Sequence, residues 1–458
     1  MSARPIQVGL IGCGTVGAGV AEILERRAGP IAARVGAPVK LRWVCDRDLR
    51  RAKALGLDRR RLTSNVEDVL RDPAVDIVVE LVGGYEPART FILEALRRGK
   101  HVATANKAVL AKYWTEIFST AQKHHALVYF EASVGAGIPV IQGLNEGLAA
   151  NRIQSILGIL NGTTNYILSR MSRDGAEFGA ALKAAQKAGF AEADPTFDVE
   201  GMDAVHKLAI LGALAFGAPL PLESIAREGI TGIEADDVRY AQTEFGYVLK
   251  LLGIARRPDA RPDRPGLSAP DGGVVHVEAG VYPTLIPRTH PFANVQDEYN
   301  AMLITGDAVG DVMFYGKGAG QGTAASGVAG DIIYLARHVH HGTAGRVALV
   351  VPDASVRVKV ISPELIEARQ YLRFTTLDRP GVLSRIAGIL SRHGVSIASI
   401  VQKEPRSAAG SRRPAQVQIL MLTHKALEGR VRRALADISR LAVVKAPTRR
   451  LRVEDGTG

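Results

Sequence analysis

The sequence predicts an α/β protein of three domains, which cover residues 1–142, 143–342 and 368–453. The first 140 residues alternate short apolar strands with helical stretches, which is typical of a parallel sheet covered by helices. After residue 143 the order of elements changes and indicates a mixed α+β domain. The segment 371–453 has the order β-α-β-β-α-β, which predicts a small ferredoxin-like domain.

Composition favours a folded intracellular protein. With 458 residues the chain is too long for one hydrophobic core, because a domain usually has about 100–200 residues. Apolar residues make up 47% and charged residues 23%, so we expect folded structure nearly throughout. Two cysteines exclude a disulfide framework, and no apolar run approaches the roughly 20 residues of a membrane span. A soluble, cytoplasmic protein without a membrane partner is therefore expected.

The net charge of +12 raises the question of a nucleic-acid partner. The densest basic clusters contain no aromatic residues, and the chain has neither a zinc-finger spacing nor an RNA-binding aromatic motif. These clusters are residues 47–51, 59–61, 430–433 and 449–452. We interpret them as a solvated basic surface that also favours an anionic cofactor, and we expect no nucleic-acid partner.

The first domain is expected to repeat one strand-then-helix unit. Short apolar, β-branched runs predict its strands, and the amphipathic stretches between them predict its helices. The expected strands are residues 6–11, 39–45, 75–81, 101–104 and 127–131, and the expected helices are residues 15–27, 87–98 and 108–124.

A glycine motif joins the first strand to the first helix. It reads Gly12-Cys13-Gly14-Thr15-Val16-Gly17. The first glycine permits a tight turn, the second lets the backbone approach a pyrophosphate, and the third lets the helix pack on the sheet. The free N–H groups at the start of the helix favour phosphate. The motif therefore predicts a dinucleotide-binding domain of the Rossmann type.

Two conflicting signals follow the second strand. Asp46 could accept a hydrogen bond from a ribose 2′-hydroxyl, which favours NAD. Arg47, with Arg50 and Arg51 behind it, could bind a 2′-phosphate, which favours NADP. The arginines could also lie on a surface turn without any ligand. We expect NADP or NAD as cofactor, with use of both or a mild preference for NADP.

The second domain is expected to contain a strand, three helices and then further strands. Residues 256–273 are rich in Pro, Arg and Asp and predict an exposed loop. Residues 316–322 predict a glycine-rich loop, and the domain should end near His341. The expected strand is 153–160, and the expected helices are 166–171, 178–188 and 202–216.

The segment 185–207 is rich in residues that can transfer protons or bind charged groups, with five acidic residues and a lysine between Glu192 and Lys207. Asp203 and Lys207 are four residues apart and share one helix face. On an exposed helix they would form a surface ion pair, but the apolar residues that follow indicate a buried helix. A lysine that loses hydration can exchange a proton near neutral pH, as alcohol oxidation requires when hydride goes to nicotinamide. The pattern predicts proton transfer by Lys207, with carboxylates holding a cationic group of the substrate.

This stretch resembles the signature of homoserine dehydrogenases and matches its defining positions without a gap or substitution. Further segments similar to that family occur in the expected order between residues 5 and 342, namely 104–107, 131–139, 161–165 and 316–320. The resemblance implies that L-homoserine and L-aspartate 4-semialdehyde are interconverted with NAD(P)⁺ and NAD(P)H. This reaction belongs to the biosynthesis of threonine, methionine and isoleucine.

The resemblance also implies roles for individual residues. Lys207 would donate a proton to the aldehyde oxygen, Lys107 is a second candidate, and Asp203 would bind the substrate ammonium group. The other residues implied at the substrate are Glu192, Asp198, Gly189 and Thr163. Those implied at the cofactor, besides the first glycine motif, are Thr104, Lys107, Gly189, Glu192, Gly318 and Gly320. Glu131, Val134, Ala136 and Ile138 would form a monovalent-cation site for Na⁺ or K⁺, mostly through backbone carbonyls.

The C-terminal domain begins with a strand, a turn at 378–383 and a helix, and Pro380 and Gly381 break the chain at that turn. The expected strands are 371–376, 395–401, 417–423 and one near 442–446, and the expected helices are 381–393 and 425–438. Residues 403–415 are expected to form a mobile hairpin loop, and residues 343–367 a link.

This frame resembles an ACT domain, a sensor of small molecules that usually pairs with another copy. The resemblance implies an effector at Gly381, Val382, Ser396 and Ile397, and a homodimer or larger homo-oligomer. In homoserine dehydrogenases with this domain the effector is typically L-threonine; methionine or no ligand stays open. Every motif assigned to catalysis precedes residue 342, so we expect the chemistry not to need this domain.

Two other functions fit part of the pattern. Aspartate-semialdehyde dehydrogenase also uses a Rossmann domain, but it needs a catalytic cysteine in the second domain, and both cysteines precede residue 46. A nucleotide-sensing regulator would bind the cofactor without turnover. An activity assay with homoserine separates that regulator from an enzyme.

Overall fold

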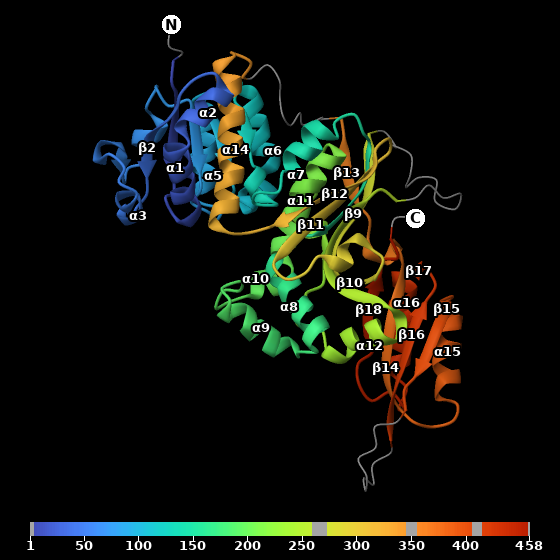
Figure 1. The fold of residues 1–458 in the computed structure, drawn as a ribbon. Coiled ribbons are helices and arrows are strands. Elements are labelled where there is room, and N and C mark those ends of the chain that lie inside the picture. The colour runs from blue at the N-terminus through green and yellow to red at the C-terminus, as the bar shows by residue number, and fades with distance from the viewer. Residues whose placement is uncertain (1–3, 259–272, 345–354, 405–414, 457–458) are drawn as a thin grey trace.

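The computed structural model describes residues 4–258, 273–344, 355–404 and 415–456, and it confirms the predicted α/β fold class (Figure 1). The loops expected at 256–273 and 403–415 lie mostly outside the described residues. Arg256 itself ends a strand rather than beginning a loop.

A parallel six-stranded sheet forms the core of the N-terminal domain. Its strand order, β3-β2-β1-β4-β5-β6, is that of a Rossmann fold, and it places the start of α1 at the carboxyl edge of the central strand. The strands are β1 (Ile6–Ile11), β2 (Val39–Cys45), β3 (Leu62–Thr63), β4 (Ile77–Glu80), β5 (His101–Thr104) and β6 (Val128–Tyr129). Three of the five predicted strands have the predicted bounds, those predicted at 75–81 and 127–131 are shorter, and β3 was not predicted.

Helices cover both faces of this sheet. They are α1 (Thr15–Arg26), α2 (Ala28–Val35), α3 (Arg50–Ala54), α4 (Glu67–Leu70), α5 (Ala88–Arg97) and α6 (Lys107–Lys123). One further helix, α14 (Gln321–His340), comes from much later in the chain and packs against α1 and α2. Its buried residues Ala325, Val328 and Ile332 join the core of the N-terminal domain. The domain boundaries at residues 142 and 342 stay a prediction, but α14 packs with the first domain rather than with the second.

The middle domain places a mostly antiparallel sheet beside a group of helices (Figure 1). The helices are α7 (Val140–Gln142), α8 (Gly162–Asp174), α9 (Phe178–Lys187), α10 (Thr196–Val199), α11 (Met202–Phe216) and α12 (Ala235–Phe245). The strands are β7 (Ile153–Ile159), β8 (Ala226–Arg227), β9 (Tyr247–Arg256), β10 (Val274–Pro287), β11 (Tyr299–Gly306) and β12 (Gly310–Lys317). The predicted helix 166–171 is the middle of the longer α8, which begins at Gly162 because Asn161 caps it.

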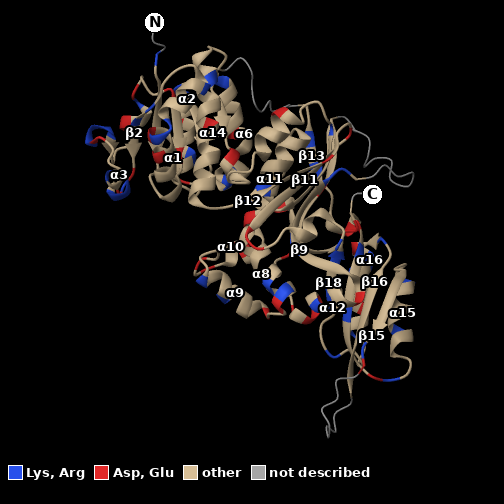
Figure 2. Cartoon of the chain, in the orientation of Figure 1, with Lys and Arg blue, Asp and Glu red and all other residues tan. Residues whose placement is uncertain are grey.

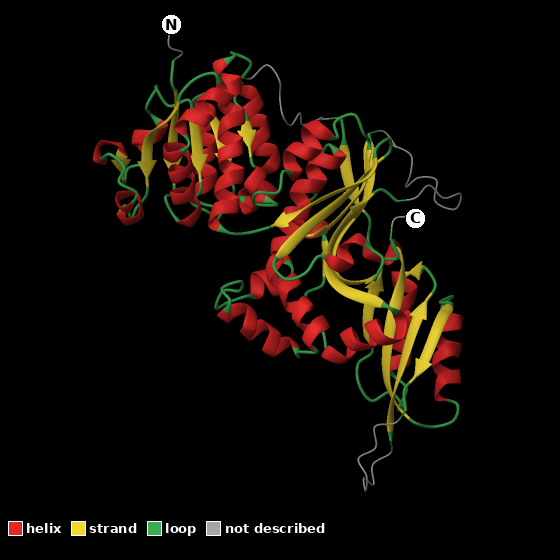
Figure 3. Ribbon diagram, viewed as in Figure 1, coloured by secondary structure: helices red, strands yellow, loops and turns green. Residues whose placement is uncertain are grey.

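The C-terminal domain continues the sheet of the middle domain (Figure 3). The strand order runs β12-β11-β7-β9-β10-β18-β14-β16-β15, and β18 pairs with β10 at Thr284 and Leu285. Its elements are β14 (Glu367–Leu377), α15 (Val382–Arg392), β15 (Ile397–Gln402), β16 (Gln416–Thr423), β17 (Ala426–Leu427), α16 (Glu428–Ser439) and β18 (Arg449–Val453). In the expected link, β13 (Arg357–Val360) also pairs with β10.

The prediction of a last strand near 442–446 is wrong. That segment makes only an isolated bridge, between Val444 and Thr376, and the last strand is β18. Sequence reasoning passed over β18 because three of its five residues are arginines. Their charges are neutralised by acidic residues that lie far away in the sequence.

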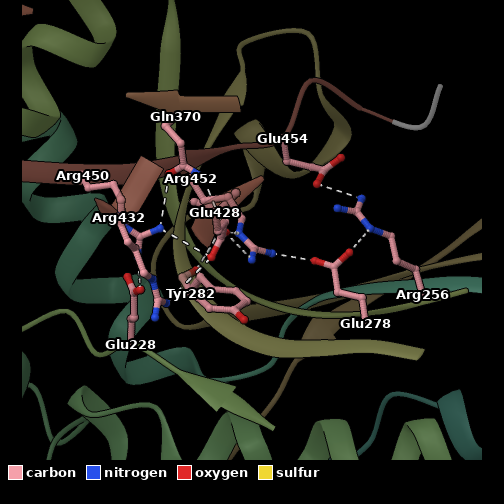
Figure 4. Close-up of polar contacts among 11 residues, drawn as sticks. Glu228, Arg256, Glu278, Tyr282, Gln370, Glu428, Arg432, Arg450, Arg452 and Glu454 are labelled. Atoms are coloured by element: carbon pink, nitrogen blue, oxygen red, sulfur yellow. Dashed lines mark hydrogen bonds and ion pairs between the residues drawn. The ribbon is translucent and has the colours of Figure 1, made fainter. Parts of the chain in front are cut away.

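A buried ion-pair network joins the two domains around Arg452 (Figure 4). Its guanidinium lies 2.6 Å from Glu278 on β10 and 2.6 Å from Glu428 at the start of α16, and it stacks on Tyr282 at 3.8 Å from the ring centroid. Glu278 also binds Arg256 at 2.7 Å, and Arg256 binds Glu454 at 2.9 Å. Arg452, Glu278 and Glu428 are all nearly inaccessible to solvent. The C-terminal domain is therefore attached through buried charges as well as through strand pairing.

The exposed arginines of the N-terminal clusters lie beside acidic residues (Figure 2). Arg50 pairs with Asp48 at 2.6 Å, and Arg60 pairs with Asp58 at 2.7 Å. These pairs lie in the solvated surface that the composition predicts. The same interpretation is wrong for the cluster 449–452, because Arg452 is buried and Arg450 mostly buried among acidic residues of other elements.

Candidate active site

Helix α11 carries the acid and the lysine that the sequence singles out. It lies between Gly201 and Gly217, whose φ angles of +79° and +80° are left-handed and favour glycine. Asp203 and Lys207 are 4% and 8% exposed, so the expectation of a buried helix is confirmed.

The carboxylate of Asp203 lies between two ammonium groups. Lys207 Nζ is 2.8 Å from its Oδ2 atom, and Lys107 Nζ is 3.2 Å from its Oδ1 atom. Lys107 begins α6 of the N-terminal domain, and α6 packs against α11. The cluster therefore forms where the Rossmann domain meets the middle domain.

The turn between β7 and α8 holds this cluster from the other side. The carbonyl of Leu160 accepts a hydrogen bond from Lys207 Nζ at 2.7 Å. The side-chain amide of Asn161 donates to Asp198 at 2.8 Å and to Asp203 at 2.9 Å. Sequence reasoning did not assign a role to Asn161, although it lies in a segment, 161–165, that resembles the family.

The pKa values of Asp203 and Asp198 are shifted in opposite directions. Burial opposes ionisation of Asp203, but the attraction of Lys207 and Lys107 outweighs burial and holds its pKa below the usual value. Burial and then the charge of Asp203 raise the pKa of Asp198. The surroundings therefore favour ionisation of Asp203, between the two lysines, and oppose ionisation of Asp198.

Three residues predicted at the substrate lie around α9. Thr163 is buried at the start of α8, and its hydroxyl donates to the carbonyl of Phe190 at 2.6 Å. Gly189 has a left-handed φ of +78° and is exposed. Glu192 is exposed too, and its backbone carbonyl accepts from Gln186 at 3.1 Å. Thr163 thus contacts the turn that carries Gly189 and Glu192, and both of these residues are exposed to solvent.

An aromatic pair that sequence reasoning missed lies beside the lysines. Phe197 is 45% exposed, its ring centroid is 5.9 Å from Lys107 Nζ, and its ring packs edge-on against His206 at 5.4 Å. Burial, and then the charge of Lys107, lower the pKa of His206. The only sequence signal was an aromatic residue inside an acid-rich stretch.

The glycine motif has the geometry that dinucleotide binding requires. Gly12 has a φ of +97°, and a Cβ at Gly17 would lie 2.0 Å from the Gly12 carbonyl oxygen. A Cβ at Gly14 would meet nothing within 4 Å, so the backbone is open to a ligand there. Thr15 and Val16 begin α1, and the hydroxyl of Thr15 accepts from Arg51 at 2.8 Å.

The carboxylate of Asp46 and the side chain of Arg47 occupy different surroundings. Asp46 accepts a hydrogen bond from the backbone of Cys13 at 2.6 Å and another from Asp48 at 3.0 Å. Arg47 is exposed directly after it. Arg50 and Arg51 pair with Asp48 and Thr15, so Arg47 is the arginine of this group most available to a ligand.

Buried Glu80 links the ends of two strands beneath Lys107. It accepts hydrogen bonds from Val82 at 2.7 Å and from the hydroxyl of Thr104 at 2.8 Å. Thr104 in turn accepts from the backbone of Asn106, which caps α6 immediately before Lys107. Thr104 is therefore fully buried, and through Asn106 it helps to fix the start of α6, where Lys107 lies.

The glycine-rich segment 316–320 leaves β12 beside the cluster. A Cβ at Gly318 would lie 2.1 Å from the side-chain amide of Asn300, so only glycine fits there. Gly320 has a φ of +118° and precedes α14, which packs on the Rossmann domain.

The four residues that resemble a cation site lie in one buried loop. Both carboxylate oxygens of Glu131 accept backbone N–H groups, from Ile141 at 2.8 Å and from Gln142 at 2.9 Å. Ala136 has a φ of +54°, which is uncommon outside glycine. Val134, Ala136 and Ile138 are buried, so any ligands from this loop are backbone carbonyls.

The predicted effector residues lie at the starts of α15 and β15 of the C-terminal domain. Gly381 has a φ of +85°, is exposed and precedes α15, whose first residue Val382 is buried. Ile397 is the first residue of β15 and Ser396 precedes it, and the Ser396 carbonyl accepts from the backbone N–H of His424 at 2.9 Å. Among the described residues, no cluster of His, Cys, Asp and Glu could hold a metal ion, and no helix could cross a membrane.

Comparison with known families covers most of the chain. The model of the homoserine dehydrogenase family matches residues 139–333, the model of the homoserine dehydrogenase NAD-binding domain matches 12–131, and the ACT domain model matches 370–441. A homoserine dehydrogenase of Pseudomonas aeruginosa is 41% identical over 453 residues, which are 98% of this chain and 99% of the relative. The crystal structure of a homoserine dehydrogenase from Thiobacillus denitrificans is 45% identical, with a TM-score of 0.89 and 99% of each chain covered. A hyperthermophilic archaeal homoserine dehydrogenase in complex with NADPH is 25% identical, with a TM-score of 0.59, over 72% of this chain and 98% of that chain.

Proposed function

Because the chain belongs to the homoserine dehydrogenase family, we propose that Lys207 delivers the proton when L-aspartate 4-semialdehyde is reduced to L-homoserine. The observation that carries this proposal is the pairing of Lys207 with Asp203 at 2.8 Å inside a buried helix. A charged amine held at one point is suited to protonate a developing alkoxide. Bound NADH or NADPH supplies the hydride.

The other charged residues set up this transfer. Asp203 orients both lysines, since each of its oxygens faces one ammonium group. Lys107 lies on the other side of Asp203 and balances the negative charge that remains on Asp203 after Lys207 gives up its proton. Asp203 and Glu192 bind the ammonium group of the substrate, with Asp198 in support, and Gly189 leaves space for substrate and nicotinamide.

The activity itself is tested by following absorbance at 340 nm while the purified chain oxidises L-homoserine with NAD⁺ or NADP⁺. Formation of NADH or NADPH that depends on homoserine supports the proposal. Cofactor binding without turnover would instead favour a nucleotide-sensing regulator.

We propose that Arg47 makes NADP the preferred cofactor. Arg47 is exposed after Asp46, and the archaeal relative binds NADPH, which supports a 2′-phosphate at this place. Arg47→Ala should raise the Michaelis constant for NADP⁺ about ten- to hundredfold, because a charge-assisted phosphate contact is lost. The constant for NAD⁺ should change little. Equal effects on the Michaelis constants for NADP⁺ and NAD⁺ would show that Arg47 lies on a surface turn without binding the 2′-phosphate.

The loop 131–138 is proposed to bind Na⁺ or K⁺ through the carbonyls of Glu131, Val134, Ala136 and Ile138. The positive φ of Ala136 supports this role, because such strain is retained where a carbonyl must point in an unusual direction. The Glu131 side chain is held in place, since both its oxygens accept backbone N–H groups. Activation by K⁺ or Na⁺, but not by a bulky organic cation, is the expected result.

A homodimer or larger homo-oligomer is also proposed. The edge strand β12 exposes Met313 and Tyr315, and the turn before it exposes Val309, which supports pairing with a second copy. The proposed compartment is the cytoplasm, in keeping with the biosynthetic reaction. Light scattering of the purified chain and cell fractionation test the two proposals.

L-threonine is proposed as effector at Gly381, Val382, Ser396 and Ile397. Gly381→Asp should abolish inhibition by threonine while turnover stays near wild type, because its carboxylate would meet the ligand's carboxylate. Gly381→Ala is the matched control, since it imposes the same left-handed strain without a charge. If Gly381→Asp remains as sensitive to threonine as wild type, the effector does not bind at this turn.

A further inference from the structure

The backbone carbonyl of Leu160 accepts hydrogen bonds from two side chains, those of Lys207 and Asn300. The Leu160 carbonyl oxygen lies 2.7 Å from Lys207 Nζ and 3.0 Å from the side-chain amide nitrogen of Asn300. Asn300 is the second residue of β11, which pairs with β7 one residue before Leu160. The side chain of Asn300 thus extends the ladder of hydrogen bonds to the end of β7.

The side-chain amide of Asn300 makes one hydrogen bond among the described residues, the one to the Leu160 carbonyl. Asn300 is fully buried, and its Oδ1 atom has no hydrogen-bond partner among the described residues. The orientation follows from chemistry, because a carbonyl oxygen at Leu160 requires the NH₂ side of the amide. A buried acceptor without a partner costs about 1–3 kcal/mol, so stability alone does not explain an asparagine here.

Asn300 also contacts the two glycine segments beside the cluster. A Cβ at Gly318 would lie 2.1 Å from its amide nitrogen, and a Cβ at Gly162 would lie 3.4 Å from its Oδ1 atom. Asn300 is therefore packed between the start of α8 and the glycine-rich segment 316–320. Its position depends on the backbone on both sides.

We propose that Asn300 is a positioning residue for Lys207. By donating to the Leu160 carbonyl it keeps that oxygen directed at the Lys207 ammonium, which then lies between Asp203 and the reacting oxygen of the substrate. The proposal rests on proton transfer by Lys207. It adds that the segment 316–320, through its contact with Asn300, helps to set where that proton is delivered.

The test compares Asn300→Ala and Asn300→Asp with the wild-type enzyme. Both variants lose the donor, and Asn300→Asp keeps the volume if the smaller residue impairs folding. We expect kcat to fall about 10- to 100-fold, since displacement of a reacting group by about 1 Å has effects of this size. The Michaelis constant for NADP⁺ should change less than threefold, and the solvent deuterium isotope effect on kcat should rise because proton transfer becomes slower.

Asn151→Ala is the control for loss of a structural asparagine. Asn151 accepts from Val309 at 2.9 Å at the far end of the β11–β12 hairpin, away from the lysines. Its kcat and its isotope effect should stay near wild type. A loss in Asn151→Ala equal to that in Asn300→Ala would assign Asn300 a structural role only and overturn the proposal.

A double-mutant cycle separates this proposal from the proposed function. If Asn300 acts through Lys207, Asn300→Ala should lower kcat less than threefold in a Lys207→Met background. The same loss in both backgrounds would overturn the role of Asn300 while leaving that of Lys207 intact. Full activity of Lys207→Met alone would overturn the proposed function, and the role of Asn300 with it.

Discussion

Replacement of Lys207 by methionine is expected to lower kcat about 10²- to 10⁴-fold, the usual contribution of a positioned proton donor. Methionine fills much of the same space on α11 but carries no proton. Asp203 keeps Lys107 at 3.2 Å as a counter-charge, so the helix should stay folded. NADPH binding, followed by fluorescence titration, should stay near wild type because the glycine motif lies in the N-terminal domain.

Lys100→Met is the matched control. Lys100 is also buried, and its ammonium donates to the carbonyl of Val75 at 3.0 Å, but it precedes β5 at the opposite edge of the sheet from the glycine motif. Its turnover should remain near wild type. If Lys207→Met keeps activity within a few-fold of wild type, Lys207 has no part in proton transfer.

Replacement of Arg452 by methionine is expected to lower the free energy of unfolding by about 3–5 kcal/mol. The loss follows from leaving Glu278 and Glu428 buried with fewer counter-charges, and from removing the contact with Tyr282 at 3.8 Å. Chemical denaturation followed by circular dichroism measures it. Because β18 pairs with β10, the middle and C-terminal domains should unfold in one transition.

Arg440→Ala supplies the comparison with an exposed pair. Arg440 binds Asp437 at 3.3 Å with a side chain that is 80% exposed, and its loss should change stability by less than about 1 kcal/mol. A similar small effect of Arg452→Met would show that the buried network does not hold the domains together.

The same contacts bear on the expectation that the C-terminal domain is not needed for chemistry. Removing it after Ala344 would expose the edge of β10 and leave Glu278 and Arg256 without Arg452 and Glu454. A truncated chain would thus test stability and regulation together. Gly381→Asp isolates regulation, because it changes only an exposed turn.

Local spacing predicts the glycine motif and the Asp203–Lys207 pair, because both depend on residues within one or two helical turns. The support of Lys207 could not be predicted in the same way. Asn300 lies 140 positions from Leu160, and no periodicity links the two. Sequence alone therefore indicates Lys207 as the proposed proton donor, but it does not indicate the Leu160 carbonyl and the Asn300 amide beside it.

For the last strand of the C-terminal domain, local composition predicted a strand at the wrong place and missed β18. Residues 442–446 read Ala-Val-Val-Lys-Ala, and the two adjacent valines favour a strand, whereas Arg449–Val453 contains three arginines. The arginines are tolerated because Glu228, Glu278 and Glu428 reach them from other elements. Burial of a charged strand depends on partners that only the folded chain brings together.

The role of Lys207 is tested most directly by restoring an amine at its position. Lys207→Cys should be nearly inactive, and treatment with 2-bromoethylamine converts the cysteine into a close analogue of lysine. Cys13 and Cys45 are buried, and the treated wild-type enzyme controls for their modification. If Lys207 transfers the proton, turnover should rise at least tenfold once mass spectrometry shows modification at residue 207. Complete modification at that residue without any gain in turnover would contradict the proposed mechanism.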